Sequence, residues 1–192
     1  MPGVAEFLGP DGVVFGYLTS TSLMGRGEPY RTPPVESLHA ETELAVTLGQ
    51  DISPTADVAA CHDALAGFAV AVEIVDVAQP PVGGMHEIIA ENVYHRAVAF
   101  GPTRPIAALP AHATGEIAVD DSTRETGLLR EDPADSVLAI ARLLAAVGER
   151  LRAGDRIITG SITHVPVQPG DEVRGEIQGL GTAELSVAAP AN

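Results

Sequence analysis

The chain contains no lysine, and all eleven of its basic residues are arginine. A Schiff base and a lysine general base both need the amine of a lysine side chain, so neither chemistry is open to this protein. A GC-rich genome that favours arginine and alanine codons explains the absence without any functional reason. The restriction on the chemistry holds whatever the cause.

Positive charge is scarce in general. The 26 acidic residues outnumber the basic ones and give a formal net charge of −15. Nucleic acids and anionic membranes attract basic surfaces, so neither is expected as a partner.

Cysteine and long apolar runs are also scarce. The single Cys61 forms no disulfide within the chain, and it reads as a small apolar side chain and a cytoplasmic thiol. No apolar run approaches the roughly 20 residues of a membrane span, and the first residues show no basic and apolar export signal. These features predict a cytoplasmic protein.

The hydrophobic fraction of 45% is high for a chain with only 4% aromatic residues. It predicts one domain over residues 1–192, with a core of alanine, valine, leucine and isoleucine. The pattern predicts an α+β fold in which strands dominate. The expected elements are a strand-like piece at Val13–Leu18, strands at about 40–48 and 67–77, a helix from Pro54 or Thr55 to Ala66, helical spacing over His86–Arg96 in a mobile lid, mostly β structure over 97–130, a long helix from Asp132 to Arg152, a strand at 156–159 with a turn at Gly160–Ser161, and further strands up to residue 187.

Three glutamates stand within the two predicted apolar strands. Glu41 and Glu43 are two residues apart and therefore point to one face of their strand, while Glu73 has apolar neighbours on either side. A bare buried carboxylate costs several kcal/mol, roughly, unless it is paired, protonated or bound to a metal. Three carboxylates suit a hard divalent cation such as Mg²⁺ or Mn²⁺. The alternative is that Glu41 and Glu43 face solvent and Glu73 pairs with an arginine, and the pattern alone leaves both open.

Several short motifs resemble the fumarylacetoacetate hydrolase superfamily, and within it the branch of the 2-oxopent-4-enoate hydratases and 4-oxalocrotonate decarboxylases. They follow one another in the order of that family and touch most of residues 15–187. The motifs are Leu18-Thr19-Ser20, the Glu-x-Glu at 41–43, Glu73-Ile-Val-Asp76, the segment 151–161 after the long helix, and the pair 165–173 and 179–181.

The resemblance implies a fold and a set of site residues. The fold is the mainly β fumarylacetoacetate hydrolase C-terminal-like fold, a mixed β-roll or sandwich with one long helix and short helices. Mg²⁺ or Mn²⁺ is the implied cofactor and a small 2-oxo acid the implied substrate. The metal ligands are Glu41, Glu43 and Glu73; the substrate-binding residues are Thr19, Ser20, Thr159, Gly160 and Ser161; the candidates for acid–base catalysis are His86, Glu87, Glu91 and His164.

A few residues carry weaker expectations. His39 shares the face of Glu41 and is a fifth acid–base candidate, while Arg31 and Arg96 are candidates for a second substrate carboxylate. Asp76 is expected to be structural or to support the metal ligands. Each histidine also has an ordinary reading as a surface or hydrogen-bonded residue.

The chain departs from the family pattern at three places. Its N-terminal helical segment is shortened or absent. Phe15 stands where a lysine commonly precedes the Leu-Thr-Ser motif. The usual Ala-Asp-Asn followed by small residues is Ala90-Glu-Asn-Val-Tyr-His95, which is bulkier and carries a histidine. The metal site is thus expected to be kept while the groups that move protons have changed.

The resulting expectation is a metal-dependent lyase, a hydratase or decarboxylase, that acts on a 2-oxo or 2-hydroxydienoic acid through a metal-stabilised enolate. The alternatives are an acylpyruvate-type C–C hydrolase or tautomerase, an isomerase or cyclase of secondary metabolism on the same fold, and a non-catalytic subunit. A homo-oligomer is expected in each case, since the family commonly forms dimers and higher assemblies.

Overall fold

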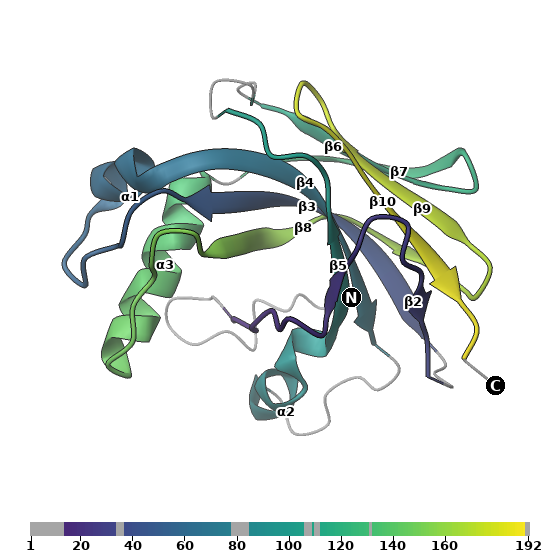
Figure 1. Ribbon diagram of the computed structural model, residues 1–192, viewed down its shortest axis with the longest axis horizontal. Helices are drawn as coiled ribbons and strands as arrows, with labels where there is room; N and C mark the ends of the chain where they lie inside the picture. Colours follow the sequence, from purple (N-terminus) through teal and green to yellow (C-terminus); the bar gives the residue numbers. More distant parts are fainter. Residues whose placement is uncertain are drawn as a thin grey trace.

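The structure, a computed structural model, describes residues 14–33, 37–77, 85–105, 109, 112–130 and 132–190, the side chains of Met85 and His86 excepted. Two five-stranded sheets form most of it (Figure 1). The first sheet contains, in spatial order, β1 (Leu23–Met24), β5 (His95–Phe100), β4 (Leu65–Asp76), β3 (Leu38–Leu48) and β8 (Arg156–Pro166). The second contains β2 (Tyr30–Arg31), β10 (Gly181–Ala188), β9 (Glu172–Ile177), β6 (Thr114–Val119) and β7 (Ser122–Leu128).

The helices are short apart from one. They are α1 (Val58–Ala64), α2 (Met85–Ala90), the single turn η2 (Asn92–Tyr94) and α3 (Pro133–Ala146). In Figure 1, α1 and α3 lie together at the left end and α2 lies below the first sheet. No helix in the described ranges is long and apolar enough to cross a membrane. The α+β architecture and the dominance of strands are as the sequence predicts.

The core lies where the two sheets face each other. Along β3 the alternate residues Ala40, Thr42, Leu44 and Val46 are fully buried and point toward the second sheet. The hydroxyl of Thr42 donates to the carbonyl of Glu116, 2.9 Å away on β6, so this polar side chain is satisfied between the sheets. The residues between them in sequence, including the glutamates, must therefore point to the other face of the first sheet.

That outer face carries a second, small apolar cluster. It consists of Ala45, Ala69, Ala71 and Val98, with Leu18, Phe100 and Ile158 packed against it. Three of its four buried members are alanines, so the side chains of this cluster project only a short way from the strands. The alternation of β3 and β4 thus gives one face to the core and the other to a site.

The long helix is shorter than predicted. α3 begins as expected, with the Asp132 carboxylate accepting from the backbone N–H of Ala134 at 2.9 Å and Pro133 in the first turn. It ends at Ala146 rather than Arg152, because Gly148 takes a left-handed φ of +78° that terminates a helix. Val147 is therefore 74% exposed, and Leu151 reaches the core from the following loop.

The helix predicted over His86–Arg96 is wrong in its second half. α2 stops at Ala90, three residues of η2 follow with positive φ, and β5 begins at His95. β5 pairs with β4 on one side and with β1 on the other. These long-range backbone hydrogen bonds override a local helical spacing.

Three further local predictions differ from the structure. Gly160 and Ser161 do not form a turn but lie inside β8, where the register with β3 shifts around Glu43 as in a β-bulge. The strand-like piece at Val13–Leu18 forms no strand over residues 14–18, and Val13 lies outside the described residues. The helix expected to start at Pro54 or Thr55 begins at Val58, where Asp57 caps it.

Gly101 offers a direct test of how closely β5 approaches the second sheet. A Cβ at this position would lie 2.2 Å from the backbone oxygen of Thr182, which cannot move without shifting β10. We expect Gly101→Ala to lower the free energy of unfolding by about 3 kcal/mol in urea denaturation. Gly25→Ala is the control, because its Cβ would meet only the flexible side chain of Glu28 and should change stability by less than about 1 kcal/mol.

Candidate metal centre

The three glutamates meet on the outer face of the first sheet. Glu41 on β3 is directly opposite Glu73 on β4, and Glu43 is opposite Ala71, so the three side chains share one face. One carboxylate oxygen from each lies within 4.8 Å of the others. Glu43 and Glu73 are buried, with 3% and 7% exposed, while Glu41 is half-buried. The solvent-facing alternative for Glu43 is therefore wrong.

The electrostatic cost of this arrangement appears in the pKa values of the carboxyls. Burial, followed by the charges of Glu73 and Glu41, raises the pKa of Glu43 well above its ordinary value. Burial and the charge of Glu41 raise the pKa of Glu73 to about 8. No arginine of the described residues forms an ion pair with these three carboxylates. The centre therefore contains more negative charge than the surrounding protein neutralises.

In the described part of the chain, a hydrogen bond from outside the cluster helps to fix each glutamate. The backbone N–H of Gly160 donates to Glu43 Oε2 at 2.9 Å. His164 Nδ1 bonds Glu41 Oε1 at 2.5 Å, and His95 Nδ1 bonds Glu73 Oε1 at 2.6 Å. Each of these hydrogen bonds engages one carboxylate oxygen of its glutamate. Donors behind the ligand groups in this way are typical of metal sites, where they orient the ligands.

The residues present fit a divalent cation. The donor set is three carboxylates, which is the chemistry that Mg²⁺, Mn²⁺ and Ca²⁺ prefer. A cation would also remove the repulsion that raises the pKa values of Glu43 and Glu73. The groups that could hold the ion are thus Glu41, Glu43 and Glu73.

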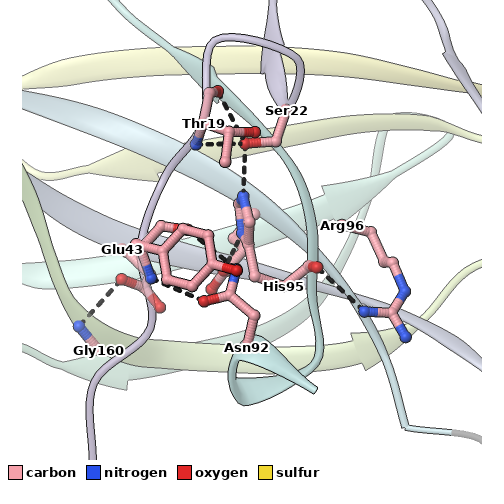
Figure 2. Close-up of polar contacts among 9 residues, drawn as sticks. Thr19, Ser22, Glu43, Asn92, His95, Arg96 and Gly160 are labelled. Carbon is pink, nitrogen blue, oxygen red and sulfur yellow. Dashed lines mark hydrogen bonds and ion pairs between the residues drawn. The ribbon is translucent and has the colours of Figure 1, made fainter. Parts of the chain in front are cut away.

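His95 is the residue of this site to which the sequence gave no role. It is 8% exposed, and its two ring nitrogens have separate partners. Nδ1 lies 2.6 Å from Glu73 Oε1, and Nε2 lies 2.8 Å from the Ser22 hydroxyl, a contact that Figure 2 shows. Burial lowers the pKa of His95. The signal available in the sequence was a histidine in place of a small residue after Ala90-Glu-Asn, but its partners come from β4 and from residue 22, distant in sequence.

The turn that precedes His95 is left-handed throughout. Asn92, Val93 and Tyr94 have φ values of +53°, +57° and +63°. A β-branched residue such as Val93 is rarely found there, and each such residue costs about 1–3 kcal/mol. Tertiary contacts hold the turn in place. Asn92 accepts from the backbone N–H of Tyr17 at 2.7 Å and donates to its carbonyl at 2.9 Å.

The predicted substrate-binding residues lie at the site in different ways. The backbone N–H of Thr19 donates to the Ser22 hydroxyl at 3.1 Å, so residues 19–22 form a tight loop, in which Ser20 is exposed. Gly160 gives its N–H to Glu43, and Ser161 donates its hydroxyl to the carbonyl of Thr163 at 2.7 Å. Thr159 is half-buried beside them on β8. These segments border the glutamates, and their role in substrate binding stays a prediction.

The acid–base candidates differ in whether they contact the three glutamates. His164 contacts Glu41, and its ring centroid lies 4.3 Å from that of His39. The hydrogen bond to Glu41 raises the pKa of His164, whereas burial and the neighbouring His164 lower the pKa of His39. Glu87 and Glu91 are exposed, and the side chain of His86 lies outside the described residues. His164 is therefore the acid–base candidate that the structure places in contact with the glutamates.

The remaining candidates lie away from the carboxylates. The Arg96 guanidinium is 3.7 Å from Asp76 Oδ2 and 3.5 Å from Glu91 Oε2, which gives Asp76 a structural ion pair. Arg31 is exposed at β2, in the second sheet. Cys61 is fully buried and free, as expected of a small apolar side chain.

Comparison with known proteins agrees with this geometry. Residues 4–188 match the family described as fumarylacetoacetate (FAA) hydrolase C-terminal. Oxaloacetate tautomerase FAHD1, a mitochondrial protein of Oryza sativa subsp. japonica, is 30% identical over 162 residues, which are 80% of this chain and 68% of the relative. A 4-oxalocrotonate decarboxylase of a Pseudomonas species is 26% identical over 93% of this chain and 72% of its own. The 2-keto-4-pentenoate hydratase of Burkholderia vietnamiensis is 26% identical over 96% and 74%.

Solved structures share the fold. The 4-oxalocrotonate decarboxylase of Pseudomonas putida G7, complexed with magnesium and adipate, superposes with a TM-score of 0.72 at 24% identity, over 80% of this chain and 61% of that one. Maleylpyruvate hydrolase of Sphingobium sp. SYK-6, in complex with manganese and pyruvate, gives 0.72 at 23% identity, over 89% and 62%. The chain thus spans less than two thirds of either structure. The family match covers nearly the whole sequence, and the chain belongs to the fumarylacetoacetate hydrolase family.

Proposed function

We propose that this protein is a divalent-metal-dependent enzyme that acts on a small 2-oxo acid. The observation that carries the proposal is the cluster of Glu41, Glu43 and Glu73, two of them buried, without an arginine partner among the described residues. A buried structural carboxylate usually has a basic partner, and Glu43 has only the backbone N–H of Gly160 from outside the cluster among the described residues. Metal ions in the decarboxylase and hydrolase structures, magnesium and manganese respectively, support the same assignment.

When bound, a Mg²⁺ or Mn²⁺ ion acts as a Lewis acid that stabilises the negative charge developing on the keto oxygen of a 2-oxo acid. The residues of the chain do the rest. Glu41, Glu43 and Glu73 would hold the ion, next to the apolar cluster that contains Ala71.

His164 is the residue proposed to move the proton. Its Nδ1 bonds Glu41, so a transferred proton leaves from or arrives at Nε2, and its side chain is 37% exposed and open to exchange with water. A raised pKa means that the imidazolium persists closer to neutral pH and can act as an acid. Because the chain contains no lysine, a side chain other than a lysine must transfer the proton, and His164 is proposed to do so.

A lyase reaction is the first candidate, in accord with the hydratase and decarboxylase relatives. In a decarboxylation the bond to the departing carboxylate breaks, carbon dioxide leaves, and a carbon of the resulting enolate takes a proton from His164 or from solvent. Keto–enol tautomerisation is the second candidate. The rice relative, which is named as an oxaloacetate tautomerase, supports it.

A substrate panel tests the proposal. The protein, with Mg²⁺ or Mn²⁺, is incubated with 2-hydroxypentadienoate, 4-oxalocrotonate, oxaloacetate and an acylpyruvate, and each reaction is followed by absorbance and by release of carbon dioxide. We expect turnover of at least one substrate that stops with EDTA and returns with metal. Hydration or decarboxylation supports the lyase, and enol–keto exchange of oxaloacetate alone supports the tautomerase. Cleavage of only the acylpyruvate would contradict both, and metal-independent turnover would contradict the metal centre.

A further inference from the structure

We propose that His95 is a positioning residue that couples the cation site to the segment Gly16–Ser22, here called the strap, so that a cation bound by Glu73 sets the strap over the glutamates. The inference rests on the proposed metal site and goes beyond it. It assigns to this chain a link between ion occupancy and the position of the strap.

The link is a continuous series of buried contacts. Glu73 Oε1 bonds His95 Nδ1 at 2.6 Å, and His95 Nε2 bonds the Ser22 hydroxyl at 2.8 Å. Ser22 Oγ also lies 3.1 Å from both the N–H and the carbonyl of Thr19. Glu73, His95 and Ser22 are each less than 10% exposed, so water does not compete for these bonds. Figure 2 shows the upper part of this series, from His95 through Ser22 to Thr19.

The ring of His95 is rigid, and both of its ends are engaged. A cation held by Glu73 fixes the plane of that carboxylate, and this plane sets the direction in which Nδ1 lies from Oε1. A change at Nδ1 therefore moves Nε2 and, with it, the hydroxyl around which residues 19–22 are folded. Such a rotation of the imidazole transmits the position of the metal ligand to the strap.

The other end of the strap is fastened without the metal site. Asn92 bonds both backbone groups of Tyr17, and a Cβ on Gly16 would lie 2.7 Å from Asn92 Oδ1 and 2.9 Å from its carbonyl oxygen. The close approach requires glycine at position 16, so the strap is held tightly against the left-handed turn. The strap is thus anchored by Asn92, the first residue of that turn, and by His95, the residue that follows it. Of the two, only His95 contacts a proposed metal ligand.

The chain provides a clean reporter of the strap, since it contains no tryptophan. The side chain of Tyr17 is 67% exposed, and the bonds to Asn92 come from its backbone. Tyr17→Trp therefore places a single fluorophore on the strap and leaves its anchors in place. We expect Mg²⁺ alone to change the emission of this variant, with a midpoint equal to the dissociation constant from calorimetry.

Two substitutions at position 95 separate the two bonds. Both are made in the Tyr17→Trp protein. His95→Asn keeps a polar group near the position of Nδ1, but its side chain is too short to contact Ser22. We expect this variant to bind Mg²⁺ with an affinity within threefold of the Tyr17→Trp protein and to show no change in emission at saturating Mg²⁺. His95→Gln keeps a donor near the position of Nε2 and loses Glu73; we expect Mg²⁺ affinity to fall about tenfold. Ser22→Ala should keep the affinity and abolish the emission change, and it carries the test if a variant at position 95 does not fold.

His62→Phe is the matched control, because His62 is exposed and pairs with Asp132 between α1 and α3. It should change neither the affinity nor the emission. Full emission change in Ser22→Ala or His95→Asn at saturating Mg²⁺ overturns the role of His95, as does Mg²⁺ binding to the reporter protein without any change in emission. An absence of Mg²⁺ binding to the unsubstituted protein would instead remove the proposed metal site itself, so the two failures are distinguishable.

Discussion

Glu43→Gln is expected to weaken the binding of Mg²⁺ about 100-fold or more and to abolish metal-dependent turnover, while it makes the metal-free protein more stable. The amide that replaces the Glu43 carboxylate retains an oxygen that can accept from the Gly160 N–H, which lies 2.9 Å from Glu43 Oε2, so the local structure is preserved. What is lost is a charged ligand, and what is relieved is the burial of that charge beside two other carboxylates. We expect a gain of about 1–3 kcal/mol in the free energy of unfolding of the metal-free protein at pH 7.5.

Calorimetric titration with Mg²⁺ and urea denaturation in EDTA measure the two effects. Glu184→Gln on β10 is the matched control, because it removes the same charge from an exposed position. The control should leave both quantities within error. A Glu43→Gln protein that binds Mg²⁺ as the unsubstituted protein does, or that is less stable without metal, would show that Glu43 is a structural residue and not a ligand.

The second large effect is a dependence on pH. As the pH rises, the stability of the metal-free protein is expected to fall while its affinity for the metal rises. The pKa of Glu73 is raised from 4.5 to about 8 in the folded metal-free protein, and that of Glu43 is raised as well. Between these pH values the unfolded chain has lost protons that the folded protein keeps, so stability is greatest below pH 4.5 for these groups and falls as the pH rises toward 8. The expected slope is about 1 kcal/mol per pH unit for each group that retains its proton.

Metal affinity must rise over the same range, since a cation binds the carboxylates and displaces their protons. We expect a roughly tenfold increase per pH unit between pH 6 and 7.5 for each proton released. Urea denaturation in EDTA and Mg²⁺ titration at pH 6.0, 6.75 and 7.5 give both slopes. Glu73→Gln should flatten the stability profile. Stability that rises with pH in the metal-free protein would contradict the raised pKa values.

The three glutamates proposed as metal ligands stand out in the sequence because their pattern is local. A glutamate in an apolar strand, or two glutamates separated by one residue, conflicts with burial in a way that the sequence alone displays. The residues that support those ligands could not be found in this way. Each glutamate has a partner from a segment distant in sequence, which strand pairing brings next to it. His164 on β8 contacts Glu41, Gly160 in the bulge of β8 contacts Glu43, and His95 at the start of β5 contacts Glu73.

The errors in the fold have the same origin. The spacing of residues 86–96 favours a helix, but pairing of β5 with β4 and β1 ends it after Ala90. The strand–turn reading of residues 156–161 relied on Gly160, whose left-handed φ of +106° serves a bulge within β8 instead. In both places the local preference was weak, and hydrogen bonds to distant strands decided the outcome.

The sequence by itself determined the α+β class, the family, the placement of Glu41 and Glu43 on one strand face and the exclusion of lysine chemistry, because alternation, composition and motif order are readable one residue at a time. The tertiary structure decided that Glu43 and Glu73 are buried together, that His164 contacts Glu41, and that His95 joins Glu73 to Ser22. Those facts depend on the register of β3 with β4 and β8, and register is a property of the paired strands that no single strand carries.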